Sequence, residues 1–192
     1  MEIGVLALQG DFAEHLSILA QIGVKGREVR LPGQLEGLDG LIIPGGESTT
    51  IGKMAVDFEL IEPLRQFGLK KAIWGTCAGA ILLSKDVHSK QPLLGLMDIT
   101  VARNAFGRQV DSFEIDLRAP FLEAQDSEAK SYHAVFIRAP IIESVYGRAE
   151  VLLQVPHGQI VAAKQGRLLA TSFHPELTED DRFHRYFLEL TQ

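Results

Sequence analysis

The amino-acid sequence predicts an α/β protein with a mostly parallel central sheet and helices on both of its faces. In the first half of the chain, short apolar runs alternate with longer segments of helical periodicity, as in successive strand–helix–strand units. The runs are apolar throughout, which is typical of strands buried on both faces. In the second half the strand signals lie closer together, and they predict extra antiparallel strands there.

In the first half, short β-rich runs alternate with longer helical patterns. Ser48 or Thr49 is expected to cap a helix that runs toward Phe67. A helix after the first strand has apolar residues spaced for one buried face. The expected elements in this half are residues 3–8, 11–22, 25–30, 38–43, 48–67, 71–74 and a helix from 79 onward.

The second half is expected to add strands and a C-terminal helix. The turn "KQGR" joins two apolar runs and is typical of a hairpin. The expected strands are residues 98–102, 112–117, 134–138, 149–155, 160–163 and 168–172, followed by a helix over 179–190. Since no linker or repeat interrupts the pattern, we expect one domain over residues 1–192. Its predicted architecture is a flavodoxin-like three-layer α/β/α fold.

Composition and charge exclude several classes of protein. The 192 residues are 46% hydrophobic and 23% charged, with a formal net charge of −6, which argues against binding to nucleic-acid phosphates. No apolar run approaches the roughly 20 residues that span a bilayer. The N-terminus "MEIGVLALQGDF" lacks the basic start of a signal peptide. One cysteine cannot form an intramolecular disulfide, so a reducing cytoplasm is expected.

That cysteine, Cys77, lies in the stretch "WGTCAGA" after an apolar run. The form G-x-C-x-G is the thiol counterpart of the nucleophile elbow, a sharp strand-to-helix turn with an exposed nucleophile at its apex. The helix dipole would favour the thiolate, and the backbone N–H of Ala78 would point toward a forming oxyanion. The alternative is a small buried core cysteine, and the motif alone leaves both open.

A base for this thiol is suggested by "TSFHPEL" near the C-terminus. Pro175 favours extended geometry at His174, and side chains two apart in an extended segment project to the same side. Glu176 is therefore expected to orient His174, which makes a base and its orienting acid. A surface tripeptide without function is the alternative. The scattered histidines and single cysteine offer no zinc-ligand spacing, so no metal is expected.

The loop "IIPGGEST" follows the strand expected at 38–43 and precedes a helix. Its paired glycines free the backbone to turn N–H groups toward a ligand. A phosphate nest is one interpretation, although no P-loop lysine or dinucleotide-binding pattern is present. In a second interpretation, the N–H of Gly46 completes an oxyanion hole opposite Ala78. In a third, the loop is only a glycine-rich turn followed by a helix cap.

PGGES, G-T-C-A-G and H-P-E occur in this order on an alternating α/β pattern, and together they resemble the class I (triad) glutamine amidotransferases. The stretches "LALQGDFAEHL", "PGGESTTI", "GTCAGAILL", "ARNAFGRQVDSFE", "VFIRAP" and "ATSFHPEL" are similar to the glutaminase subunits of pyridoxal 5′-phosphate synthases. The similarity extends from about residue 3 to the final helix.

The resemblance implies a hydrolase that releases ammonia from L-glutamine through a cysteine thioester. Its implied catalytic residues are Cys77 as nucleophile, His174 as general acid and base, and Glu176 as the residue that orients His174. The implied glutamine-binding residues are Gly46, Glu47, Ser48, Arg103, Ile137 and Arg138. An arginine suits the α-carboxylate of glutamine, and Glu47 suits its α-ammonium group.

The resemblance also implies a partner, a separate synthase (lyase) subunit that receives the ammonia. Docking is expected to raise glutaminase activity, and a flip of the Gly45–Gly46 peptide offers a physical route. Pyridoxal phosphate would be the product of the complex, so no cofactor is expected on this chain. Two alternatives are a γ-glutamyl hydrolase or cysteine peptidase on the same scaffold, and a non-catalytic flavodoxin-like binding module.

Overall fold

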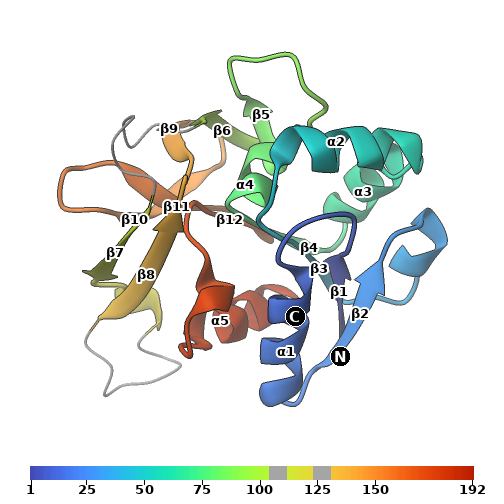
Figure 1. Cartoon of the computed structure of the whole chain (residues 1–192), viewed down its shortest axis with the longest axis horizontal. Coiled ribbons are helices and arrows are strands. Elements are labelled where there is room, and N and C mark those ends of the chain that lie inside the picture. The colour runs from blue at the N-terminus through green and yellow to red at the C-terminus, as the bar shows by residue number, and fades with distance from the viewer. Residues whose placement is uncertain (104–111, 123–130) are drawn as a thin grey trace.

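A ten-stranded sheet forms the centre of the protein in a computed structural model that describes residues 1–103, 112–122 and 131–192 (Figure 1). The order along the sheet is β2-β1-β3-β4-β12-β11-β9-β6-β5, and β10 pairs with β11. Strands β7 and β8 form a second, two-stranded sheet. The predicted α/β class with a mostly parallel central sheet and antiparallel strands in the second half is confirmed.

The parallel half of the sheet is built from the first four strands and β12. Each of the pairs β2–β1, β1–β3, β3–β4 and β4–β12 is parallel. The strands are β1 (Glu2–Leu6), β2 (Lys25–Val29), β3 (Gly40–Ile43), β4 (Ala72–Thr76) and β12 (Leu168–Thr171).

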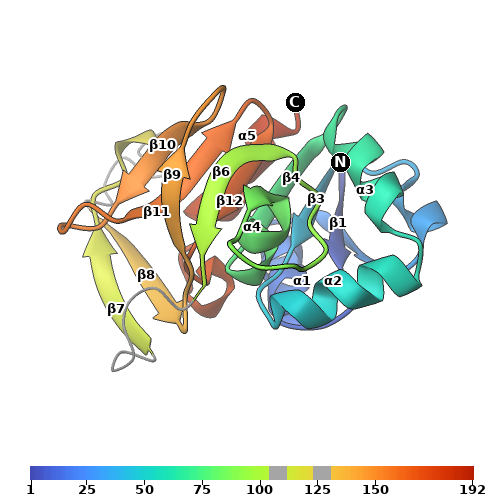
Figure 2. The same cartoon turned by 90° about the horizontal axis from the view of Figure 1, so that it is seen from above.

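Helices cover both faces of this half, which makes three layers (Figures 1 and 2). One face carries α1 and α5, and Leu19 of α1 and Phe187 of α5 share an apolar cluster with Trp74 of β4. The other face carries α2, α3 and α4 over a second apolar cluster. The helices are α1 (Phe12–Gln21), α2 (Ser48–Asp57), α3 (Ile61–Gly68), α4 (Ala78–Leu83) and α5 (Arg182–Leu190), with 3₁₀ turns at Pro32–Leu35, Pro120–Leu122 and Pro175–Leu177.

The second half extends the sheet with mostly antiparallel pairs. The predicted hairpin is present, since β11 pairs antiparallel with β12 through Ala163 and Ala170. The small β7–β8 sheet packs its aromatic side chains against α5, and Tyr132 and Phe183 have ring centroids 4.7 Å apart. The remaining strands are β5 (Ser84–Asp86), β6 (Met97–Ala102), β7 (Ser112–Leu117), β8 (Tyr132–Ile137), β9 (Ile141–Val145), β10 (Glu150–Gln154) and β11 (Ile160–Gln165).

The structure corrects the predicted second helix. The chain forms two helices, α2 and α3, because the segment between them turns at Glu59, whose φ is +56°. The cap is neither Ser48 nor Thr49, because the carboxylate of Glu47 accepts the Thr49 N–H at 3.1 Å. Strands β5 and β9 were not predicted, and α5 begins later than expected, at Arg182. In the part of the chain that the structure describes, no helix has the length and apolarity to cross a membrane.

The turn from β4 into α4 packs tightly against the end of β3. A Cβ atom on Gly79 would lie 2.0 Å from the carbonyl oxygen of Ile43, and one on Gly75 would lie 2.4 Å from the carbonyl of Gly79. Real Cβ atoms do not approach backbone atoms so closely, so both positions require glycine. The sharp turn predicted from G-x-C-x-G is therefore enforced by packing.

We predict that Gly79→Ala lowers the free energy of unfolding by at least about 1–3 kcal/mol, because the added methyl must displace the backbone of β3. Urea denaturation measures this change. Gly33→Ala is the matched control, since a Cβ at Gly33 meets no atom within 4 Å. Equal stability of the Gly79→Ala variant and the wild type would show that the turn has room to relax.

Candidate active site

The carboxyl ends of four parallel strands bring the candidate residues together. Gln9–Asp11 follow β1, Gly45–Ser48 follow β3, Cys77 follows β4 and His174 follows β12. Because β1, β3, β4 and β12 are parallel neighbours, these segments share one edge of the sheet. This is the edge at which open α/β sheets bind ligands.

Cys77 adopts a strained backbone at the apex of the β4–α4 turn. Its φ is +46° and its ψ is −104°, which a residue with a side chain rarely adopts. The Cys77 N–H donates to the carbonyl of Thr171 at 2.8 Å, which ties the turn to the end of β12. The residue is 7% exposed. The turn thus has the sharp geometry expected of a nucleophile elbow. The cysteine is more buried than predicted, but it lines a cavity.

His174 and Glu176 form a buried pair beside this turn. The His174 Nδ1 and the Glu176 Oε1 lie 2.6 Å apart, and the Glu176 side chain has no exposed surface. The His174 N–H donates to the carbonyl of Val135 at 2.8 Å, which fixes the backbone. A Cβ on Gly45 would lie 2.6 Å from the His174 Cε1, so the ring packs directly on the glycine loop.

The predicted pairing of these two side chains is present, but its expected cause is wrong. The segment after His174 is not extended, because Pro175–Leu177 form a 3₁₀ turn. The proline begins this turn, and the turn brings Glu176 back toward the imidazole. The two side chains therefore meet because of the 3₁₀ turn and their hydrogen bond, and not because they alternate along a strand.

The surroundings of His174 favour its protonated form. Burial of the ring lowers the pKa of His174, but hydrogen bonds with Asp11, Cys77 and Glu176 outweigh this effect and raise the pKa to about 12. The Asp11 Oδ2 lies 3.4 Å from the His174 Nδ1. Burial raises the pKa of Glu176, and the hydrogen bond with His174 acts in the opposite direction. The imidazole therefore carries a proton that it can donate to a leaving group.

A cavity of about 410 Å³ opens above the cysteine, a size suited to a small amino acid. Nine of its lining residues are among those predicted from the sequence: Gly46, Glu47, Ser48, Cys77, Ala78, Arg103, Ile137, Arg138 and His174. Glu176 is absent from the lining because it lies behind His174. Gln9, Gly10, Asp11, Ile81, Pro140 and Leu177 also line the cavity and were not assigned a role. The Gln9–Asp11 loop could have been found from its place directly after a buried strand.

Glu47 and Arg103 contact each other. The Arg103 Nη2 lies 3.2 Å from the Glu47 Oε1, and hydrogen bonds from the Thr49 hydroxyl and N–H lower the pKa of Glu47. Glu47 was predicted to bind the α-ammonium group of glutamine and an arginine its α-carboxylate. If Arg103 is that arginine, both side chains must bind glutamine while they stay close to each other. The rest of "ARNAFGRQVDSFE" from 104 to 111 lies outside the described residues.

The two predicted oxyanion donors both line the cavity. The Ala78 N–H is the first of helix α4 and needs no partner inside the helix. Gly46 has a φ of +147°, and the Gly45 carbonyl accepts the Asp11 N–H at 3.2 Å. The Gln9 side chain accepts the Glu47 N–H at 2.7 Å. The role of Gly46 and Ala78 as an oxyanion hole stays a prediction.

Among the described residues, one set of three potential metal ligands has donor atoms within 4.8 Å of one another: Asp11, His174 and Glu176. The His174 Nδ1 and the Glu176 Oε1 already bond to each other at 2.6 Å. The arrangement therefore fits hydrogen bonding within the pair.

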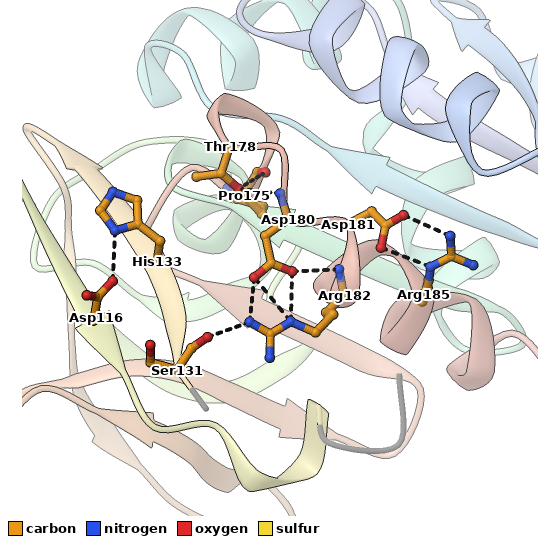
Figure 3. A network of polar contacts seen from close by, with 9 residues as sticks. All are labelled: Asp116, Ser131, His133, Pro175, Thr178, Asp180, Asp181, Arg182 and Arg185. Carbon is orange, nitrogen blue, oxygen red and sulfur yellow. Dashed lines mark hydrogen bonds and ion pairs between the residues drawn. The ribbon is translucent and has the colours of Figure 1, made fainter. Parts of the chain in front are cut away.

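A polar network holds the chain after Glu176 in place (Figure 3). The Arg182 side chain donates to the Asp180 carboxylate and, at 2.5 Å, to the carbonyl of Ser131 next to β8. The Thr178 hydroxyl donates to the Pro175 carbonyl at 3.3 Å. The Asp180 N–H donates to the same Thr178 hydroxyl at 3.3 Å, so the contacts link the 3₁₀ turn that carries Glu176 to α5 and to the start of β8.

Comparison with known proteins identifies the family. The family model described as "SNO glutamine amidotransferase family" matches residues 5–192. The chain belongs to this family.

Curated relatives agree over nearly the whole chain. The pyridoxal 5′-phosphate synthase subunit PdxT of Herpetosiphon aurantiacus is 57% identical over 195 residues, which cover 99% of this chain and 100% of the relative. The protein of the same name from Moorella thermoacetica is 56% identical, with 99% of each covered. A crystal structure of a glutamine amidotransferase superposes with a TM-score of 0.90 at 49% identity and covers 98% of each chain.

We predict that His184→Phe reduces the acid sensitivity of this family member. Burial lowers the pKa of His184 from 6.5 to about 3. Between these values the unfolded chain binds a proton that the folded chain excludes, so stability is fully present above pH 6.5 and falls as the pH drops toward 3.

Removing this histidine should lower the slope of the unfolding free energy against pH by about 1.4 kcal/mol per pH unit in this range. Urea denaturation between pH 4.5 and 6.5 measures it, with the exposed His157→Gln variant as control. An unchanged slope in His184→Phe would mean that the buried ring binds its proton in the folded state.

Proposed function

We propose that the chain is the glutaminase subunit of a pyridoxal 5′-phosphate synthase and hydrolyses L-glutamine to L-glutamate and ammonia. The observation that carries the proposal is the strained Cys77 turn beside the buried His174–Glu176 pair, at one end of a cavity of about 410 Å³. Family membership and the names of the relatives support the same activity. Residues 1–192 would form one glutamine amidotransferase domain, and its free thiol suits the reducing cytoplasm.

In the proposed first step, the Cys77 thiolate attacks the side-chain amide carbon of glutamine. The N–H groups of Gly46 and Ala78 hold the oxyanion of the tetrahedral intermediate. The His174 imidazolium donates its proton to the amide nitrogen as the carbon–nitrogen bond breaks, and ammonia leaves. The product of this step is a γ-glutamyl thioester on Cys77 and a neutral imidazole.

In the second step, water hydrolyses the thioester. The interaction with Cys77 is one of those that raise the pKa of His174, and it is lost when the sulfur is acylated. Loss of this interaction lowers the pKa of His174, so the imidazole left neutral by the first step stays neutral and is free to accept a proton from water. His174 takes a proton from the attacking water, glutamate leaves, and the thiolate–imidazolium pair forms again.

The proposed substrate contacts come from the rim of the cavity. Glu47 and Arg103 would bind the α-ammonium and α-carboxylate groups, with Gly46, Ser48, Ile137 and Arg138 completing the site. Ile137 is 38% exposed, and Arg138 follows it with a φ of +44° at the end of β8. Both residues line the cavity. Free L-glutamine and γ-glutamyl peptides used as competing substrates would separate a glutaminase from the alternative γ-glutamyl hydrolase.

The proposed partner is a pyridoxal 5′-phosphate synthase (lyase) subunit that receives the ammonia in a heteromeric complex. The names of the relatives support it. The chain itself has a site sized for glutamine, and ammonia must leave that site to be used elsewhere. Pyridoxal phosphate would then be a product of the complex.

We predict that Cys77→Ala reduces ammonia release in the presence of the synthase by at least about 10³-fold, because it removes the nucleophile. The fold should be retained, since a methyl group replaces a small buried side chain. Ammonia release is measured by coupled assay, and circular dichroism checks the fold. Full activity in this variant would overturn the assignment of Cys77. His174→Ala should be similarly inactive, and His157→Ala, at an exposed site, should retain full activity.

We further predict that the synthase raises glutamine turnover by this chain. In the free chain the Gly45 carbonyl is held by the Asp11 N–H, and the proposed peptide flip must break this bond. The measurement is ammonia release per chain with and without the synthase, at saturating glutamine. A rise of about tenfold or more is expected if docking shifts a minor conformation to the major one. Equal turnover would contradict activation by docking.

A further inference from the structure

The two oxygens of the Glu176 carboxylate have different surroundings. Oε1 bonds to the His174 Nδ1 at 2.6 Å. Oε2 is fully buried and has no well-aligned hydrogen-bond donor among the described residues. The Nε2 atom of His15 lies 3.3 Å from Oε2. A buried carboxylate oxygen without a donor is strongly unfavourable, so this nitrogen is the natural partner.

His15 has a fixed place beneath the proposed catalytic pair. It lies in helix α1 and is 0% exposed. Its Nδ1 atom lies 2.9 Å from the Nε2 of His184 in α5, which is also 0% exposed. The indole of Trp74 packs edge-on against both rings, with centroid distances of 5.7 and 5.0 Å. Both imidazoles are therefore locked in orientation.

The contacts determine which ring nitrogens carry hydrogen. Burial lowers the pKa of both His15 and His184, so each ring is neutral and has one N–H and one lone pair. The negative Oε2 of Glu176 requires the hydrogen of His15 on Nε2. The Nδ1 of His15 is then an acceptor, and His184 must donate to it from its own Nε2. The Nδ1 of His184 is left as a lone pair, and it has no hydrogen-bond partner among the described residues.

We propose that His15 is a positioning residue, whose Nε2–H holds the second oxygen of Glu176 while His184 fixes the tautomer of His15. The chain Cys77–His174–Glu176 then continues inward through His15 and His184. This inference rests on the proposed glutaminase function, and it adds a residue that acts through Glu176 without touching substrate.

The nearby ionisable groups do not offer Oε2 another donor. His174 faces the opposite oxygen, Oε1. Asp11 is negatively charged and raises the pKa of Glu176. The Tyr132 hydroxyl does not bond to Oε2; burial raises its pKa, and an interaction with the Thr178 hydroxyl acts in the opposite direction. The Thr76 Oγ1 lies 3.4 Å from the same His15 nitrogen, and it competes with Oε2 only if the Thr76 hydroxyl donates its hydrogen to that nitrogen.

The first test is the tautomer of His15 in the wild-type chain. Long-range ¹H–¹⁵N spectra of histidine-labelled protein at pH 7 report which nitrogen carries hydrogen, and H15Q and H184F spectra assign the two signals. We expect Nε2–H on both His15 and His184. Hydrogen on the Nδ1 of His15, with Nε2 accepting from Thr76, would overturn the proposal. This result does not depend on activity, so it stays informative if the glutaminase function fails.

The second test compares two amides at position 15, assayed with the synthase present. The amide nitrogen of Gln reaches the place of Nε2, whereas that of Asn takes the place of Nδ1 and leaves Oε2 without a donor. We expect H15Q to keep kcat within about threefold of wild type. H15N should lose roughly tenfold in kcat with little change in KM, because transition-state alignment is lost rather than substrate binding.

The pH profile separates positioning from structural damage. In H15N the ionised carboxylate is less stabilised, so the acid limb of kcat should move upward by about one pH unit, a shift that lower stability alone does not produce. The matched controls H157Q and H157N, at an exposed histidine, should keep the wild-type profile. Equal activity and equal profiles in folded H15Q and H15N would overturn the proposal. Absence of wild-type ammonia release would instead overturn the glutaminase function.

Discussion

The parallel pairing of β4 with β12 is the constraint on which the rest of the site depends. Thr76 lies opposite Thr171 at the last register position, and the Cys77 N–H continues the ladder to the Thr171 carbonyl at 2.8 Å. Two parallel neighbours end at the same edge of a sheet, so whatever follows them must meet. This pairing brings the cysteine turn and the His-Pro-Glu turn together, although they are far apart in the sequence.

Burial explains why the groups at this edge must satisfy one another. Glu176 and His15 have no exposed side-chain surface, so water cannot solvate their polar atoms. The 2.6 Å hydrogen bond with His174 satisfies Oε1 of Glu176, and the proposed contact with His15 satisfies Oε2. The strained backbone of Cys77 is a second unfavourable feature, and the tight packing of Gly75 and Gly79 holds it in place. The proposed catalytic residues thus lie where the surrounding packing holds a strained backbone and buried charged groups in place.

Local signals in the sequence predicted much of this arrangement. Apolar runs indicated the parallel strands, and paired glycines around Cys77 indicated the sharp turn. The break between α2 and α3 at Glu59 was missed, although Pro63 in the first turn of α3 is a signal for a new helix start. Residues whose role depends on tertiary contact were also missed: His15 and His184 come from helices at opposite ends of the chain, and Asp11 reaches His174 only because β1 and β12 lie in one sheet. The resemblance to glutamine amidotransferases supplied the rim residues Arg103, Ile137 and Arg138, which no local pattern singles out.

The central claim is that this edge of the sheet activates the Cys77 thiol toward a glutamine-sized substrate. The most direct measurement treats the chain, with the synthase present, with an electrophilic glutamine analogue and maps the adduct by mass spectrometry. We expect one adduct per chain on Cys77, formed in step with the loss of ammonia release and prevented by excess glutamine. Loss of activity without an adduct on Cys77, or an adduct that glutamine does not prevent, would contradict it.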